Sequence, residues 1–521
     1  MNKKITAALL SLGLLASAFA GCSGKTADPS GEGEAASEKT LVFGDTTFNA
    51  ENGEADINPH KDSGGWACIR YGVGETLFRF SDSMEVEPWL AESYENVDEN
   101  TWVITLRDQV AFTSGRTMDA QAVKECLEAL AADHERAAGN LKIQEITAQG
   151  QTLTIRTEEP VPALINYLAD PYACIIDMEA GVTEDGIVSG TGPYKAVSLV
   201  TDSSLSLVKN ENYWDGEPKL DSITVRTISD GDTLTMALQS GEIDAAYGMP
   251  YASYPLFESD VYTFTSCATS RVFFGAMNFE SGITSDPAVR QAIAMGIDKD
   301  SFVETLLDGN GYPAQGVYPD SFSFGGESVS AEGYDPQGAE EILEKAGWVD
   351  TDGDGIREKD GQKLTLRWLT YPSRQELPLL AEAAQASLLE IGIEVQINNT
   401  ADHNTIRMDS GAWDIYVSAF VTAPTGDPEY FFDYCCLDDS AQNVGHYHND
   451  RLEELAEELS GTFDTARRGE LAVEMQQLLL EDHAYVFCSH LRMSMISRAE
   501  VTGLTAHPCD YYEITVDLDI Q

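Results

Sequence analysis

An α/β fold is predicted for the body of this 521-residue chain, because strand-like and helix-like segments alternate along it. Residues 101–107 (TWVITLR) and 152–157 (TLTIRT) alternate apolar and polar side chains between polar turns, which is typical of half-buried strands. Farther along, a strand, a helix and a second strand are predicted in KLTLRWLTY, PLLAEAAQASLLEIG and IEVQI. Helices that alternate with strands in this way indicate layers of helices on a sheet.

Two further helices carry the same start signal, an aspartate followed at once by a proline. Residues 286–297 (DPAVRQAIAMGI) begin with Asp286, and the helix within residues 334–348 (YDPQGAEEILEKAGW) begins with Asp335. Gly347 is expected to end the second helix, because glycine readily adopts the left-handed conformation found there. No repeat of ~20–50 residues is visible, which argues against a solenoid or a propeller.

The charge of the chain is strongly acidic. Lys and Arg together number 32 and Asp and Glu 87, which gives a formal net charge of −55. Such a surface repels DNA and RNA, so no nucleic-acid partner is expected. The same charge favours solubility, and a pocket that binds anions in this chain would need local cations.

The N-terminus predicts export. A short cationic start (MNKK) precedes an apolar run, and Ala20 and Gly21 precede Cys22, so residues 1–21 are interpreted as a signal peptide. The position of Cys22 resembles a bacterial lipobox, whose cysteine is lipidated; an ordinary signal peptide with an incidental cysteine is the alternative. Residues 22–39 are rich in Gly, Ser, Ala and Glu and predict a flexible acidic tether. We expect an exported protein, held by lipid on the outer face of the cell membrane or periplasmic.

The cysteines and an Asp-rich segment give only weak support for a metal-binding or redox site. Eight cysteines besides Cys22 show no disulfide framework and no metal spacing, so mainly buried free thiols are expected and no pairing is predicted. Residues 350–361 (DTDGDGIREKDG) match the start of a calcium loop, but Gly361 stands where the bidentate glutamate is needed. A tight Asp/Gly turn is therefore predicted there.

Catalytic motifs are not found. The chain contains no G-x-S-x-G, no H-E-x-x-H and no G-x-x-x-x-G-K-[ST], and its carboxylates are too abundant for any pair to be diagnostic. An enzyme is not predicted, although an unrecognised extracellular hydrolase stays open as an alternative.

Eight segments follow one another in a recognisable order: INPHKDSG, ETLFRF, EPWLAESYENVDENTWVITLRDQVAFTSGRTMDAQAV, GTGPYKAVSL, KNENYWDGEPKLDSITVRTI, LQSGEIDAAYG, DPAVRQAIAMGIDKDSF and YDPQGAEEILEKAGW. As a set they resemble the bacterial extracellular solute-binding proteins of family 5, which capture peptides or nickel for ABC importers. The match runs from about residue 40 to the C-terminus.

The resemblance implies a periplasmic-binding-protein-like II fold, with two α/β lobes that close over a ligand and an extra subdomain inserted in the first lobe. The expected boundaries assign 40–72, 188–268 and 483–521 to lobe 1, 73–187 to the inserted subdomain and 269–482 to lobe 2.

The nickel-binding branch, which imports nickel as chelates with small carboxylates, looks most similar. DHERAAGNL matches a segment in which an arginine of that branch binds the chelate's carboxylates, so Arg136 is implied as a ligand residue. Peptide-binding relatives pair an aspartate near TAPTGDPEYF with the peptide's α-amino group, which implies the same for Asp427. A surface salt bridge for Arg136 and a turn role for Asp427 are the alternatives. Nickel chelate and short peptide both remain open as cargo.

Four more residues are candidates. Trp66 lies in the Gly-rich loop where family members contact ligand, and Arg271 begins RVFFGAMN, the expected second crossing between the lobes. His446 and His448 in GHYHND are spaced so that both imidazoles can reach one ion. Two solvated imidazoles on a turn are the preferred interpretation, and we expect any metal to arrive as a chelate that at most one of them touches.

The predicted function is a monomeric substrate-binding lipoprotein that delivers a small ligand to the permease and ATPase subunits of an ABC importer. No resident cofactor is expected, and nickel or another metal chelate is a possible cargo. The alternatives are an adhesin or sensor that uses the same fold and, least favoured, the hydrolase.

Overall fold

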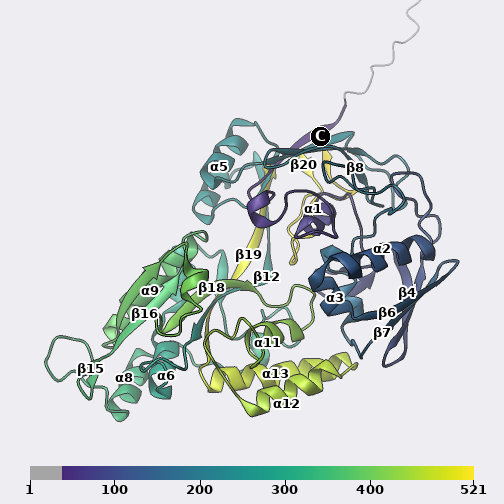
Figure 1. The fold of residues 1–521 in the computed structure, drawn as a ribbon. Coiled ribbons are helices and arrows are strands. Elements are labelled where there is room, and N and C mark those ends of the chain that lie inside the picture. Colours follow the sequence, from purple (N-terminus) through teal and green to yellow (C-terminus); the bar gives the residue numbers. More distant parts are fainter. Residues whose placement is uncertain (1–37) are drawn as a thin grey trace, which may run out of the picture. The chain divides into compact units, whose positions relative to one another are not determined.

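The computed structural model describes residues 38–521, and one mixed sheet of 11 strands runs through them (Figure 1). The predicted signal peptide, Cys22 and most of the predicted tether lie outside the described residues. The hydrogen-bonded order of the sheet is β17-β16-β18-β12-β19-β11-β1-β10-β9-β8, and β13 also pairs with β19. The strands are β1 (Thr40–Asp45), β8 (Tyr194–Val200), β9 (Ser204–Lys209), β10 (Ser222–Thr227), β11 (Ala245–Tyr247), β12 (Tyr262–Met277), β13 (Gly311–Pro313), β16 (Thr365–Thr370), β17 (Glu394–Asn399), β18 (Ile415–Val421) and β19 (Tyr485–Arg498).

The two long strands β12 and β19 connect two lobes. They lie side by side and antiparallel (Figure 1), with Tyr262–Ala268 opposite the end of β19 in lobe 1 and Val272–Ala276 opposite its beginning in lobe 2. The predicted boundary at 268/269 falls at the irregular step between these two stretches. The predicted return boundary at 482/483 stays a prediction; it lies just before β19, whose first residues pair with the lobe 2 half of β12 up to His490. A continuous strand that crosses between lobes gives no turn signal at the crossing itself.

Lobe 1 is built around β1, whose two neighbours β10 and β11 both run parallel to it. Its buried residues Leu41 and Phe43 belong to the main hydrophobic core. The helix α5 (Gly231–Ser240) begins at Asp230, whose side chain accepts the N–H of Thr233. The remaining helical segments of this part of the chain are η1 (Ala50–Asn52), α1 (Gly64–Arg70) and η3 (Tyr251–Phe257).

Lobe 2 confirms the predicted strand–helix–strand unit. β16 pairs in parallel with β17 and β18, and α9 packs on these strands. Both predicted caps are confirmed, since Asp286 accepts the N–H of Ala288 and Asp335 that of Gly338. Its helices are α6 (Pro287–Gly296), α7 (Lys299–Ser301), η4 (Phe302–Leu306), η5 (Gly326–Ser328), α8 (Pro336–Lys345), α9 (Glu376–Glu390), α10 (His403–Ile406), α11 (Glu429–Cys435), α12 (Asp450–Ser460) and α13 (Thr465–Glu481).

A separate four-stranded antiparallel sheet, in the order β4-β5-β7-β6, forms the inserted subdomain. Its strands β5 and β7 confirm the two alternating segments that were predicted as strands. The chain leaves it through GTGPY, where a Cβ on Gly190 would stand 2.2 Å from the carbonyl oxygen of Val73. The elements are β4 (Ala91–Asp98), β5 (Thr101–Leu106), α2 (Ala120–Asp133), α3 (Glu135–Leu141), β6 (Ile143–Gln149), β7 (Thr152–Thr157), α4 (Leu164–Tyr167) and η2 (Pro171–Ala173).

Three short hairpins complete the fold: β2 (Phe78–Phe80) with β3 (Val86–Pro88), β14 (Glu358–Lys359) with β15 (Gln362–Lys363), and β20 (Val501–Thr502) with β21 (Asp519–Ile520). All eight cysteines between residues 38 and 521 are free thiols, and all but Cys267 are buried. Within the same range, no helix has both the length and the apolar character needed to cross a bilayer.

Candidate ligand-binding site

A cavity of about 360 Å³ lies where lobe 1, lobe 2 and the inserted subdomain meet. It brings together three of the four predicted ligand residues, Trp66 from α1, Arg136 from α3 and Arg271 from β12. We call it the Arg136 pocket. Its other walls include Met84, Tyr247, Phe420, Tyr430, Cys509, Asp510 and Tyr511.

Close backbone contacts place Trp66 at this pocket. A Cβ on Gly64 would stand 2.4 Å from the carbonyl oxygen of Asn58, and one on Gly65 would stand 2.4 Å from that of Pro171. The two glycines therefore allow α1 to lie directly on the chain at residue 58 and on η2. The Trp66 ring, which follows them, meets the Tyr511 ring edge-on with 6.0 Å between centroids.

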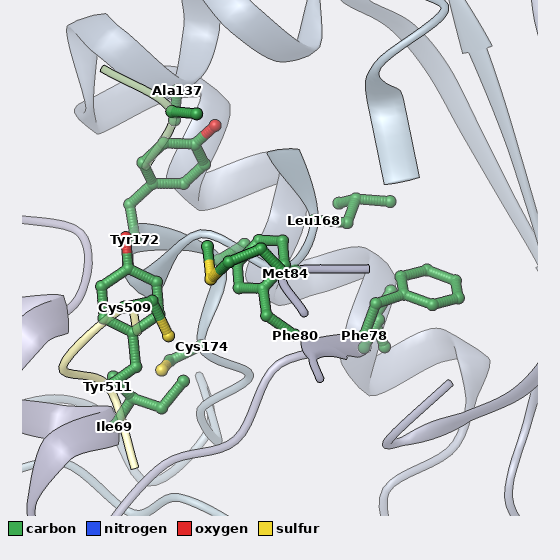
Figure 2. Close-up of a cluster of buried hydrophobic side chains, with 14 of the residues drawn as sticks. Ile69, Phe78, Phe80, Met84, Ala137, Leu168, Tyr172, Cys174, Cys509 and Tyr511 are labelled. Carbon is green, nitrogen blue, oxygen red and sulfur yellow. The ribbon is translucent and has the colours of Figure 1, made fainter. Parts of the chain in front are cut away.

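The core beneath the pocket is apolar and aromatic. Figure 2 shows Tyr511 beside Ile69 of α1 and Tyr172 beside Ala137 of α3, with Phe80 and Met84 nearby. The Phe80 and Tyr511 rings pack 6.1 Å apart. Because this packing leaves Tyr511 only 2% exposed, the pocket wall that it forms is rigid.

Arg136 is held by one carboxylate and two aromatic rings. Its Nη2 donates to Asp170 Oδ1 over 2.7 Å, and its guanidinium carbon lies 5.1 Å from the Trp66 ring centroid and 4.7 Å from that of Tyr172. Burial opposes the charge of Arg136, but Asp170 and the nearby tyrosines, Tyr172 first among them, together outweigh burial and raise the pKa of the guanidinium. Asp170 Oδ2 is buried and has no hydrogen-bond partner among the described residues. Arg136 can still bind an anion, because its bond to Asp170 uses only one of its five N–H donors.

A bulge in β12 presents Arg271 to the same pocket. Ala268 pairs with Arg492 and Val272 with His490, so three residues of β12 oppose only Leu491 of β19. Such a bulge re-aims side chains, and Thr269, Ser270 and Arg271 all line the pocket. The bulge is anchored where Thr269 Oγ1 donates to the carbonyl oxygen of Leu491 over 2.9 Å.

A wider cavity of about 580 Å³ continues from the Arg136 pocket, since Tyr247, Thr269, Arg271 and Met493 line both. It adds two arginines, Arg374 and Arg492, together with His403 and Tyr371. The His403 and Tyr371 rings stack 4.1 Å apart, and His403 Nδ1 lies 2.8 Å from the Tyr416 hydroxyl. The two cavities form one cleft between the lobes.

Known proteins resemble this chain over most of its length. The model of the bacterial extracellular solute-binding proteins, family 5 middle region, matches residues 85–443. The chain belongs to this family. The nickel-binding protein NikA of Staphylococcus aureus is 28% identical over 450 residues, or 86% of this chain and 89% of NikA. The glutathione-binding protein GsiB of Pectobacterium atrosepticum is 28% identical over 456 residues, or 83% of this chain and 85% of GsiB.

Solved structures agree with the family fold. A nickel ABC transporter protein from Bacillus halodurans matches with a TM-score of 0.80 and 32% identity, covering 93% of this chain and 100% of that one. The fold is thus that of a two-lobed family 5 binding protein, as predicted, and the cleft lies between its lobes.

The structure does not bring Asp427, the fourth predicted ligand residue, to the cleft. Its carboxylate is 7% exposed and takes two hydrogen bonds from Arg468, Nη2 to Oδ1 over 2.6 Å and Nε to Oδ2 over 2.9 Å. It also accepts the N–H of Glu429 near the start of α11. These contacts match the turn role that was weighed as the alternative.

The two histidines of GHYHND lie on the surface and contact different carboxylates. His446 Nε2 is 3.7 Å from Glu280, whereas His448 Nδ1 is 2.9 Å from Asp438, whose hydrogen bond raises the pKa of His448. Tyr447 between them points inward, and its hydroxyl donates to Asp482 over 2.7 Å. Neither histidine lines the cleft.

The Asp-rich loop contains the one group of potential metal ligands that the described residues bring close together, Asp350, Asp352 and Glu358. Asp350 already accepts the N–H groups of Gly353 and Gly355, as expected for a tight turn. Lys363 contacts the neighbouring Asp354, and the aspartates are exposed.

Several cleft residues were missed by sequence reasoning. Arg374 had a usable signal, since it lies in the loop between β16 and α9, and ligands of α/β sheets bind beyond the carboxyl ends of strands. Arg492 and Tyr247 lie inside strands, and nothing in the sequence marks them. Asp170, the partner of Arg136, is 34 residues away along the chain, so only the fold reveals the pair.

Proposed function

We propose that this protein is the solute-capture subunit of an ABC importer and that its cleft binds a small anionic solute, first of all a metal chelate. The observation that carries the proposal is the meeting of Trp66, Arg136 and Arg271 in one pocket between the lobes. An arginine flanked by aromatic rings suits a planar carboxylate, which it can bind with two parallel hydrogen bonds. The nickel-binding relatives support the chelate as cargo.

A short peptide is the second candidate, supported by family members that bind glutathione and by the room that the two connected cavities offer. A peptide needs a carboxylate for its α-amino group. Asp427 is engaged by Arg468, which leaves Asp510 as the one carboxylate that lines the Arg136 pocket. Asp510 is itself shared with Tyr247, whose hydroxyl donates to it over 3.1 Å. This arrangement favours the chelate over the peptide.

Delivery would use closure of the two lobes about β12 and β19. A hinge at the bulge of β12 would bring Phe420 and Tyr430 of lobe 2 toward Arg136, and the permease would recognise the closed form. Export, lipidation at Cys22 and anchoring to the outer face of the cell membrane belong to the same proposal, and replacement of Cys22 by Ala should release the protein from the membrane.

Calorimetric titration tests the proposal. Nickel with and without L-histidine, and a set of di- and tripeptides, are titrated into the wild-type protein. We expect saturable binding of the chelate and weaker or no binding of the peptides. Absence of binding by both ligand classes, together with turnover of the peptides, would contradict the proposal and favour the hydrolase.

To test the role of Arg136, a variant is needed that does not leave the buried Asp170 charged and without its cation. In Arg136→Met/Asp170→Asn both charges disappear together, so the fold keeps its packing. Loss of one charge-assisted pair should weaken chelate binding by about 2 kcal/mol, roughly thirtyfold. Unchanged affinity in a variant that unfolds at the wild-type temperature would place the ligand elsewhere.

A further inference from the structure

Three arginines of the cleft form no ion pair with a carboxylate of the described residues. We call Arg271, Arg374 and Arg492 the arginine compartment. None of them forms an ion pair with a carboxylate in residues 38–521, and the side chains of Arg271 and Arg374 donate no hydrogen bond within that range. Within the same residues the Arg492 side chain donates hydrogen bonds only to Ser266, through its Nε and Nη2.

The charge around these arginines is opposite to that of the whole chain. The wide cavity is lined by three arginines and one carboxylate, Glu376, while the chain as a whole carries a formal charge of −55. Like charges have also been placed together, because Arg271, followed by burial, lowers the pKa of Arg374. Repulsion between two guanidinium groups costs stability, and it is relieved when an anion binds between them.

The wall that carries Arg374 adds further donors. Ser373, Arg374, Gln375 and Glu376 line the cavity at the start of α9, a helix of 15 residues. No side chain caps this helix start, and helix N-termini favour anions through free N–H groups and the helix dipole. Tyr371 and Ser494 supply hydroxyl groups nearby. The compartment therefore offers charged and neutral donors on several sides.

We propose that the arginine compartment is a second anion subsite, distinct from Arg136, which binds further acid groups of the captured solute. This deepens the proposed function and rests on it: the natural ligand carries two or more acid groups, one bound at Arg136 and the others at Arg271, Arg374 and Arg492. A solute with a single carboxylate fills only the Arg136 pocket, which Arg271 also lines, and leaves Arg374 and Arg492 unneutralised.

Two charge-graded series of probes test this inference by calorimetry. The first is nickel bound to iminodiacetate, nitrilotriacetate or EDTA, of which the first complex is neutral and the others increasingly negative. The second is the dipeptides Ala-Ala, Ala-Glu and Glu-Glu. In the wild-type protein, affinity should rise with negative charge within a series, and salt should weaken the most charged member most.

The decisive variant is Arg374→Gln/Arg492→Gln. We expect it to bind the most charged member of a series roughly 100-fold more weakly, about tenfold for each arginine, and the least charged member within about threefold of wild type. Arg451→Gln is the matched control, because Arg451 is an exposed arginine on α12 that pairs with Glu454 and Glu474. It should leave both series unchanged.

The possible results distinguish failure of the proposed subsite from failure of the proposed capture function. Binding of every probe with no dependence on charge, or an equal loss for charged and uncharged probes in the double variant, overturns the subsite and leaves the capture function standing. Failure of the wild-type protein to bind any member of either series overturns both. The single variant Arg374→Gln guards against a folding defect, since Arg374 is exposed in the cleft.

Discussion

Arg468 in lobe 2 and Arg374 in the cleft are the same residue type in opposite situations. Arg468 is 4% exposed and donates to Asp427, Glu429 and two backbone carbonyl groups. Arg374 is exposed in the cleft, and its guanidinium has no hydrogen bond to any residue in the described range. An arginine whose donors are used inside the protein stabilises the fold, whereas one whose donors are free in a cavity is available to a ligand. The difference lies in the partners and not in the residue.

The largest effect is expected at the buried arginine. Arg468→Ala leaves Asp427 and Glu429 buried without a cation and should lower the free energy of unfolding by about 3–5 kcal/mol. Urea denaturation followed by circular dichroism measures this change. The neighbouring Arg467, which is exposed and pairs with Glu458 and Glu470, is the matched control and should matter little. Equal stability of the two alanine variants would contradict the contrast.

Glu75 is a buried acid group that has hydrogen-bond donors around it but no arginine or lysine partner among residues 38–521, in contrast to Asp427 and Glu429 beside Arg468. Glu75 accepts hydrogen bonds from Tyr213, Trp214 and Thr191, and burial raises its pKa from the usual 4.5 to about 7. The folded protein keeps this proton at a pH where the unfolded chain releases it, so stability falls as pH rises from about 4.5 to about 7. Relative to Glu75→Gln, the wild-type protein should lose up to about 3 kcal/mol over this window.

Denaturation of both proteins at a series of pH values checks this prediction. The difference between them should be constant below about pH 4.5 and again above about pH 7. A difference that does not change with pH would mean that the pKa of Glu75 is the same in the folded and in the unfolded protein.

Removal of a cleft arginine should not lower the stability of the fold, in contrast to removal of the buried Arg468. Arg374→Gln takes away a charge that repels Arg271 and breaks no hydrogen bond or ion pair of the described residues, so stability should stay within about 0.5 kcal/mol of wild type or rise slightly. Thermal unfolding without ligand measures it. Destabilisation as large as that of Arg468→Ala would show that Arg374 has a structural partner after all.

The smallest effect is expected at the surface histidines. His446→Ala/His448→Ala changes two side chains that lie outside the cleft on different carboxylates, so the affinity for nickel with histidine should change less than about twofold. Titration of nickel with and without free histidine into both proteins is the check. Loss of binding only in the double variant would make the pair a direct metal site.

Local signals were sufficient for much of the fold. The caps at Asp286 and Asp335 and the alternating strands β5 and β7 depend on residues close together in sequence, and all four are found as predicted. The crossing within β19 has no such local signal, because its position depends on pairing with β12 more than 200 residues away.

The cleft shows the same division between local and distant information. Trp66, Arg136 and Arg271 were identified through segments that resemble the family, and the structure places all three in one pocket. Asp427 was identified in the same way, yet its partner Arg468 lies 41 residues further along the chain. Whether a charged side chain is free or engaged depends on such distant contacts, so sequence alone suggested Asp427 and missed Arg374.

The most direct test of the account is a crystal structure of the protein with the probe that binds most tightly in the charge-graded series. We predict that one acid group of the probe accepts hydrogen bonds from Arg136 and another from at least one of Arg374 and Arg492. A probe bound outside the cleft, or inside it without contact to any of these arginines, would contradict the account.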